Sequence, residues 1–145
     1  MKLFFDIEYL LKYNEGKNAK NCVNKIISLI LPYSNTMYDI VNTFDDVIIL
    51  DSSDEKKASY HLIFTKVVFA NIMNCKSFVQ SFLEQVSNSD ISMLTAFDSN
   101  LMPKLIIDLA VYNKGKCQKQ SVWHGLWRSL HFCTGHNSPY TLPKI

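Results

Sequence analysis

No stretch of this 145-residue sequence approaches the ~20 consecutive apolar residues that a membrane-spanning helix needs, so the sequence predicts a protein with no membrane partner. The N-terminus also lacks the pattern of a secretory signal peptide, because an acid already stands at position 6. These two absences predict an intracellular protein.

The sequence contains no Cys-x-x-Cys pair, although it has four cysteines. Their wide spacing excludes the usual disulfide framework of small secreted domains and a ribbon-type zinc site. We therefore expect reduced thiols. The four cysteines are Cys22, Cys75, Cys117 and Cys133.

Acidic residues are absent from the last part of the chain. Residues 113–145 hold five Lys and Arg and no acid, whereas residues 1–112 hold ten Lys and Arg and all thirteen Asp and Glu. This shift predicts a single core domain over 1–112 and a basic tail over 113–145. Trp123 and Trp127 fit a short amphipathic helix, and Cys133 and His136 offer zinc ligands, but the composition favours a poorly ordered or non-native terminus.

Hydrophobic periodicity in the first 112 residues predicts helices and strands in alternation. Period-2 or β-branched runs predict strands, and the recurrence of apolar residues at helical spacing predicts helices with one buried face. We expect strands over 2–9, 44–50, 58–69 and 103–112, a hairpin between the second and third of them, a helix from about 22 that Pro32 ends or bends, and a helix over 77–86.

Two acids interrupt the first apolar run. In a strand, Asp6 and Glu8 point to the same face, with Phe5 and Ile7 on the other, so the two carboxylates stand about 7 Å apart. Carboxylate oxygens are the ligands that Mg²⁺ and Mn²⁺ prefer, and a cation relieves the repulsion between them. The alternative is an edge strand with a solvated acidic face.

The later strands carry further polar residues. Ser59 and His61 share one face of the third predicted strand, whose first residues are polar and whose last are apolar. Asp108 lies alone within the apolar run 103–112, where an unpaired charge is unfavourable. Asp108 therefore needs a partner such as a metal, or it faces solvent.

Three stretches together resemble the archaeo-eukaryotic primase superfamily, and the eukaryotic primase-polymerases most of all. Residues 3–8 (LFFDIE) are similar to the family's first motif, residues 50–64 (LDSSDEKKASYHLIF) to its second, and residues 107–112 (IDLAVY) to the start of its third. The resemblance covers residues 2–113.

The resemblance implies a fold, an activity and roles for particular residues. It implies an α+β, two-layer fold with a mixed or mainly antiparallel sheet of about four strands, RNA-recognition-motif-like, and helices on one face. It implies a nucleotidyltransferase that adds nucleotides on a single-stranded or primed DNA template from nucleoside triphosphates, in the nucleus or mitochondrion. Asp6, Glu8 and Asp108 would be catalytic ligands of two Mg²⁺ or Mn²⁺ ions, and Lys57, Ser59 and His61 would bind the triphosphate.

The sequence also departs from the family. Arginines follow the family's third motif, but here none follows Tyr112 until Arg128, and the family's downstream zinc site has no counterpart in the chain. The resemblance therefore implies a truncated catalytic module that binds divalent metal but polymerises poorly. The alternatives are a catalytically impaired remnant, acting as a structural or nucleic-acid-binding protein, and a metal-dependent nuclease.

Overall fold

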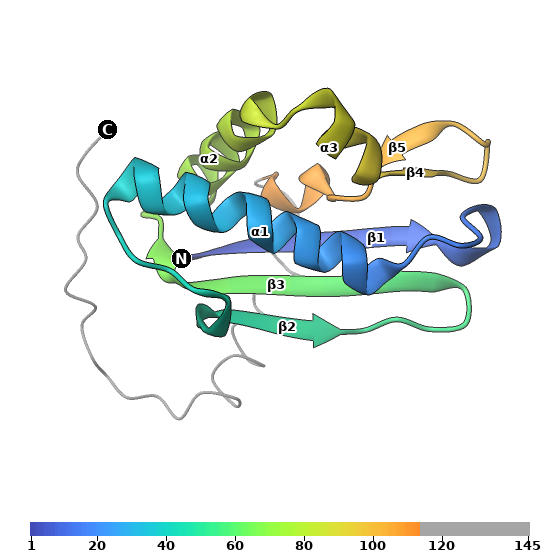
Figure 1. The fold of residues 1–145 in the computed structure, drawn as a ribbon, viewed down its shortest axis with the longest axis horizontal. Coiled ribbons are helices and arrows are strands. Elements are labelled where there is room, and N and C mark those ends of the chain that lie inside the picture. The colour runs from blue at the N-terminus through green and yellow to red at the C-terminus, as the bar shows by residue number, and fades with distance from the viewer. Residues whose placement is uncertain (114–145) are drawn as a thin grey trace.

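The computed structural model describes residues 1–113 and has two layers, an antiparallel sheet and helices on one of its faces (Figure 1). The predicted α+β class is confirmed. The predicted tail, apart from Asn113, lies outside the described residues, as do the helix and zinc ligands suggested for it.

The central sheet has three strands in the order β1-β3-β2, one fewer than the sequence suggested. They are β1 (Lys2–Leu10), β2 (Val47–Asp51) and β3 (Lys57–Val68), and both pairings are antiparallel. The predicted hairpin between β2 and β3 is confirmed. A short 3-10 helix, η2 (Phe44–Asp46), replaces the first residues of the predicted second strand, with Thr43 and Asp46 forming a capping box.

The predicted long strand over 103–112 is wrong. Only β5 (Pro103–Leu105) is a strand, and it forms a separate two-stranded sheet with β4 (Thr95–Phe97). The chain then crosses to the edge of β1, where Ile107 forms an isolated bridge with Ile7, and turns into the 3-10 helix η3 (Leu109–Tyr112). The apolar run is long because it packs against two different neighbours in succession.

Helix α1 (Ala19–Tyr38) continues through Pro32, so of the two predicted effects of this proline, that it ends the helix or bends it, the first is wrong. Pro32 removes the hydrogen bond to the carbonyl of Ser28, but both residues are exposed, so water can solvate that carbonyl. Packing holds the following turns, since the Tyr33 ring lies 5.3 Å from that of Phe78. At the start of the helix, the side chain of Asn18 accepts a hydrogen bond from the Asn21 N–H and so caps the helix.

Helix α2 (Ile72–Gln85) begins earlier than the expected Ser77. Its N-cap is Asn71, whose side chain accepts from the Asn74 N–H, and the buried Ile72 extends its apolar stripe by one turn. Ser87, which was expected to end this helix, caps the short helix α3 (Asn88–Met93).

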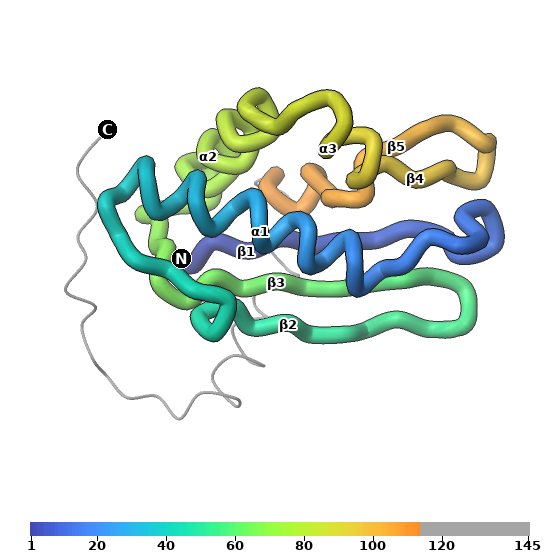
Figure 2. The backbone as a smooth tube through the Cα atoms, viewed as in Figure 1, coloured from blue at the N-terminus to red at the C-terminus, as the bar shows by residue number. Residues whose placement is uncertain are grey.

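The core lies between the sheet and these helices. Phe5 and Ile7 on β1 are fully buried, and the Phe5 ring meets Phe82 of α2 edge-on at 6.3 Å. The opposite face of β1 carries Asp6 and Glu8. Figure 2 shows the β4–β5 hairpin beside the loop that follows β1, which contains the 3-10 helix η1 (Leu11–Tyr13), and the segment after β5 returning along β1.

Candidate functional site

Strands β1 and β3 place the first two motifs side by side on the face without helices. The antiparallel register pairs Asp6 with His61, Glu8 with Ser59 and Leu10 with Lys57. Residues directly opposite in an antiparallel pair project to the same face. The prediction that Ser59 and His61 share one face of their strand is confirmed, and this is the face that carries Asp6 and Glu8.

Asp108 joins this face from the segment that follows β5. Its backbone N–H donates to the carbonyl of Asp6 at 2.8 Å, and the Glu8 N–H donates to the carbonyl of Ile106 at 2.8 Å. These two hydrogen bonds set Asp108 opposite Asp6 in an antiparallel arrangement. Asp108 therefore lies beside β1, but it is the N-cap of η3 rather than a residue within the predicted strand, and its carboxylate accepts from the Ala110 N–H at 2.9 Å.

Asp6 is the most buried of the three acids, with 4% of its surface exposed. Its Oδ1 lies 3.1 Å from Nδ1 of His61, yet this oxygen has no hydrogen-bond partner among the described residues. The distance is short enough for an ion pair if the His61 ring is protonated, but the contact is not a hydrogen bond. A buried carboxylate oxygen in this state is unfavourable, and a cation would relieve it.

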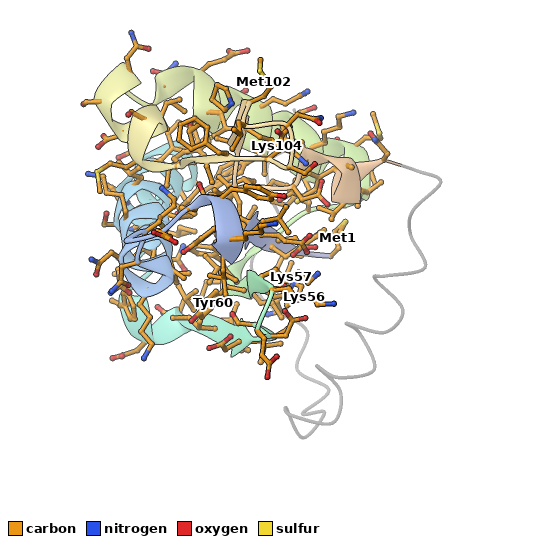
Figure 3. All side chains as sticks on the ribbon, turned by 90° about the vertical axis from the view of Figure 1, so that its right-hand side faces the viewer. Met1, Lys56, Lys57, Tyr60, Met102 and Lys104 are labelled. Carbon is orange, nitrogen blue, oxygen red and sulfur yellow. The ribbon has the colours of Figure 1, made fainter. Side chains whose placement is uncertain are left out.

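Glu8 is paired with Lys57. Nζ of Lys57 donates to Oε2 of Glu8 at 2.8 Å, and this hydrogen bond raises the pKa of the lysine. Both side chains are more than a third exposed, so the pair stabilises the fold by only about 0.2–1 kcal/mol. Figure 3 shows Lys57 beside Lys56 at the end of the sheet where β3 begins.

The loop before β3 fixes the backbone position of Lys57, the first residue of that strand. The carboxylate of Asp54 accepts from the backbone N–H groups of Lys56 and Lys57 at 2.8 and 2.9 Å, and these bonds lower the pKa of Asp54. The backbone N–H of Ser59 donates to Oγ of Ser53 at 3.0 Å. Sequence reasoning assigned no role to Asp54 or Ser53, although an Asp and a Ser just before a strand are typical of such turns.

Tyr112 is a third residue whose role the sequence did not reveal. It is fully buried, its hydroxyl donates to the Phe4 carbonyl at 2.5 Å, and its ring lies 5.1 Å from that of Phe4. Burial raises its pKa well above the ordinary value, because the phenolate would be poorly solvated. Tyr112 thus fixes the Asp108 segment to β1.

The side chains of Ser59 and His61 differ in accessibility. Ser59 is 3% exposed and His61 keeps 14% of its side chain exposed. If both side chains were fully buried among apolar residues, neither could bind a phosphate. His61 is not fully buried, so this objection does not apply to it. The role of both residues in binding a triphosphate stays a prediction.

The donor chemistry around Asp6 fits a divalent cation only in part. Within residues 1–113, no group of three or more His, Cys, Asp or Glu side chains is arranged to hold an ion. Glu8 is engaged by Lys57, and Asp108 by the backbone of η3. The face therefore presents one buried, unsatisfied carboxylate oxygen and two carboxylates that have other partners.

No helix within residues 1–113 is long and apolar enough to cross a membrane. No protein-family model matches the chain. Its matches among curated proteins are all called DNA-directed primase/polymerase protein. That of Gallus gallus is 38% identical over 85 residues, covering 57% of this chain and 15% of that protein. That of Homo sapiens is 30% identical over 105 residues, covering 71% of this chain and 18% of that protein.

The match to the protein of Danio rerio is longer, 24% identical over 146 aligned residues, and covers 79% of this chain and 28% of that protein. The chain thus spans between 15% and 28% of the length of these relatives. The chain belongs to the eukaryotic primase-polymerase family.

Proposed function

We propose that the chain carries the nucleotidyltransferase centre of a DNA-directed primase-polymerase, which adds nucleotides on a single-stranded or primed DNA template. The observation that supports this proposal best is the β1–β3 register. It sets His61 opposite Asp6, and the backbone hydrogen bond from Asp108 to Asp6 puts Asp108 on the other side of Asp6. A location in the nucleus or mitochondrion goes with this activity.

Asp6, Glu8 and Asp108 would hold two Mg²⁺ or Mn²⁺ ions, with the buried Oδ1 of Asp6 as the first oxygen available to an ion. When bound, the ions would polarise the phosphoryl group and activate the attacking hydroxyl. The residues of this chain would orient the triphosphate. Lys57 and His61 would supply charge-assisted donors and Ser59 a hydroxyl donor, and none of these donors competes with the carboxylates for the ions.

A catalytically impaired remnant is the second candidate, and two observations favour it. The described residues contain no group of three acids arranged for an ion, and the chain has no arginine between Tyr112 and Arg128. Each charge-assisted contact that is missing from a triphosphate site weakens binding by about 1.5–3 kcal/mol. A remnant would keep the fold and bind nucleic acid or a partner without synthesis.

Incorporation of labelled nucleotides on a single-stranded DNA template with Mn²⁺ separates the two candidates. The proposal expects the full chain to extend a primed strand slowly, and Asp6→Asn to abolish this extension while circular dichroism stays that of the wild type. Lys25→Met is a matched control, because Lys25 lies on α1 and its Nζ pairs with Asp90 of α3 rather than with a residue of this face. Extension that is absent under all conditions, or that survives Asp6→Asn, would contradict the catalytic proposal.

A further inference from the structure

The ion pair between Glu8 and Lys57 joins two residues to which the proposed function gives separate tasks. Glu8 would hold an ion and Lys57 would hold a phosphate, yet here Nζ of Lys57 lies 2.8 Å from Oε2 of Glu8. Lys57 is paired with Leu10 in the sheet, so its side chain extends diagonally across strands β3 and β1 to Glu8. The same carboxylate oxygen is not fully available to an ion while it accepts this hydrogen bond.

A second observation indicates that a cation belongs on this face. Asp6 is two residues from Glu8 on the same face of β1 and is 4% exposed, and its Oδ1 accepts no hydrogen bond among the described residues although Nδ1 of His61 lies 3.1 Å away. A divalent ion that bound Asp6 and Glu8 would stand within a few ångströms of the ammonium group, because Mg²⁺ sits about 2.0–2.1 Å from its oxygens. Two positive charges that close repel each other.

We propose that Lys57 is the internal counter-ion of Glu8 and that a divalent cation bound at Asp6 and Glu8 displaces it, which releases the ammonium group for a phosphate. This inference rests on the proposed function, since it concerns the order in which the same face takes up its ligands. Lys57 acts on the ion through Glu8 and is a positioning residue in this step.

The coupling has to work in both directions. If the ion weakens the Glu8–Lys57 pair, then any phosphate that draws Lys57 away from Glu8 strengthens binding of the ion, because the linkage between two sites is reciprocal. The pair would also keep the face nearly neutral without ligands, where two unpaired carboxylates would repel each other. Metal and nucleotide would therefore bind cooperatively.

A double-mutant cycle with Mn²⁺ alone tests this inference on the full 145-residue chain. The proteins are the wild type, Lys57→Met, Glu8→Gln and the variant with both changes, and free Mn²⁺ is measured by electron paramagnetic resonance. Both side chains are more than a third exposed, so these variants should fold normally. Lys56→Met is the matched control, because it removes an exposed neighbouring charge that has no bond to Glu8.

We expect Lys57→Met to tighten Mn²⁺ binding by about 3- to 10-fold, which corresponds to the loss of one competing surface pair and its charge. In the Glu8→Gln background the same change should alter the affinity by about twofold or less, because the two residues no longer interact. Lys56→Met should likewise change it by about twofold or less.

Different results would overturn different statements. If Lys57→Met leaves Mn²⁺ affinity unchanged or weakens it, or tightens it equally with Gln at position 8, the inference is wrong while the metal site stands. If the wild type binds no Mn²⁺, or binds it equally after Asp6→Asn, both the metal site and the inference are wrong. Glu8→Gln, which is already in the cycle and changes an exposed side chain, replaces Asp6→Asn in this comparison if the latter variant does not fold.

Discussion

Tyr112 makes the connection between the Asp108 segment and β1 experimentally accessible. Replacing it with Phe removes only the hydrogen bond from its hydroxyl to the Phe4 carbonyl, which should lower the free energy of unfolding by about 0.5–1.5 kcal/mol. Replacing it with Ala also removes a fully buried ring that packs against Phe4 at 5.1 Å, and this should cost about 3–5 kcal/mol. The difference in the free energy of unfolding between the two variants measures the contribution of the ring's packing.

Urea unfolding followed by circular dichroism gives both values, and hydrogen exchange shows where the loss occurs. Two amides report on the attachment of this segment, the Asp108 N–H bonded to Asp6 and the Glu8 N–H bonded to Ile106. In Tyr112→Ala these amides should lose more protection than the amides that join β2 and β3, because the segment opens locally before the sheet unfolds.

The reasoning would be refuted by either of two results. One is a loss of less than about 1 kcal/mol in Tyr112→Ala, which would mean that the ring does not pack as the structure indicates. The other is a uniform loss of protection across the whole sheet, which would mean that the segment does not open separately from β1.

Three further predictions concern the scaffold. Burial raises the pKa of the Cys75 thiol to about 12 from 9.0, so the folded chain keeps a proton that the unfolded chain loses. The free energy of unfolding should therefore fall by up to about 4 kcal/mol as the pH rises from 9 to 12, at about 1.36 kcal/mol per pKa unit. Cys75→Ala should flatten this decline when unfolding in urea is measured at each pH. The same decline with pH in the wild type and in Cys75→Ala would argue against the prediction. Leu101 has a φ of 58° and is 65% exposed, so Leu101→Gly should raise stability by up to about 1 kcal/mol in thermal unfolding, whereas Leu101→Ala should not; a loss in the glycine variant would contradict this. Asn71→Ala removes the cap of α2 and should cost about 1 kcal/mol in the same assay, and an unchanged melting temperature would show that the cap bond is dispensable.

The order of apolar and polar residues along the chain was enough to predict the strands in which buried and exposed residues alternate. The alternation around Asp6 and Glu8 was enough to predict β1 and the face of its acids, and the polar run after Leu50 was enough to predict the hairpin that pairs β2 with β3. These features depend on side-chain period and turn chemistry, both of which are properties of neighbouring residues. The wording of the three motifs was enough to indicate the family, which the relatives confirm.

Long-range packing decided the features that the sequence predicted wrongly. The helix through Pro32 persists because the rings of Tyr33 and Phe78 pack together, although the local signal favours an end. The run 103–112 is apolar throughout, and only the fold shows that it leaves one sheet at Leu105 and joins another at Ile107. The pattern of apolar residues along the chain does not specify which neighbour each apolar side chain will contact.

The sequence by itself determined which residues form the candidate site, and the tertiary structure decided how their charges are paired. Period alone placed Asp6 with Glu8 on one face of their strand and Ser59 with His61 on one face of another, and the register then shows that the two pairs share a face. The contact of Glu8 with Lys57, the burial of Asp6 against His61 and the capping role of Asp108 arise only when three distant segments meet. Charge pairing depends on distances between atoms far apart in the chain, and only folding sets those distances.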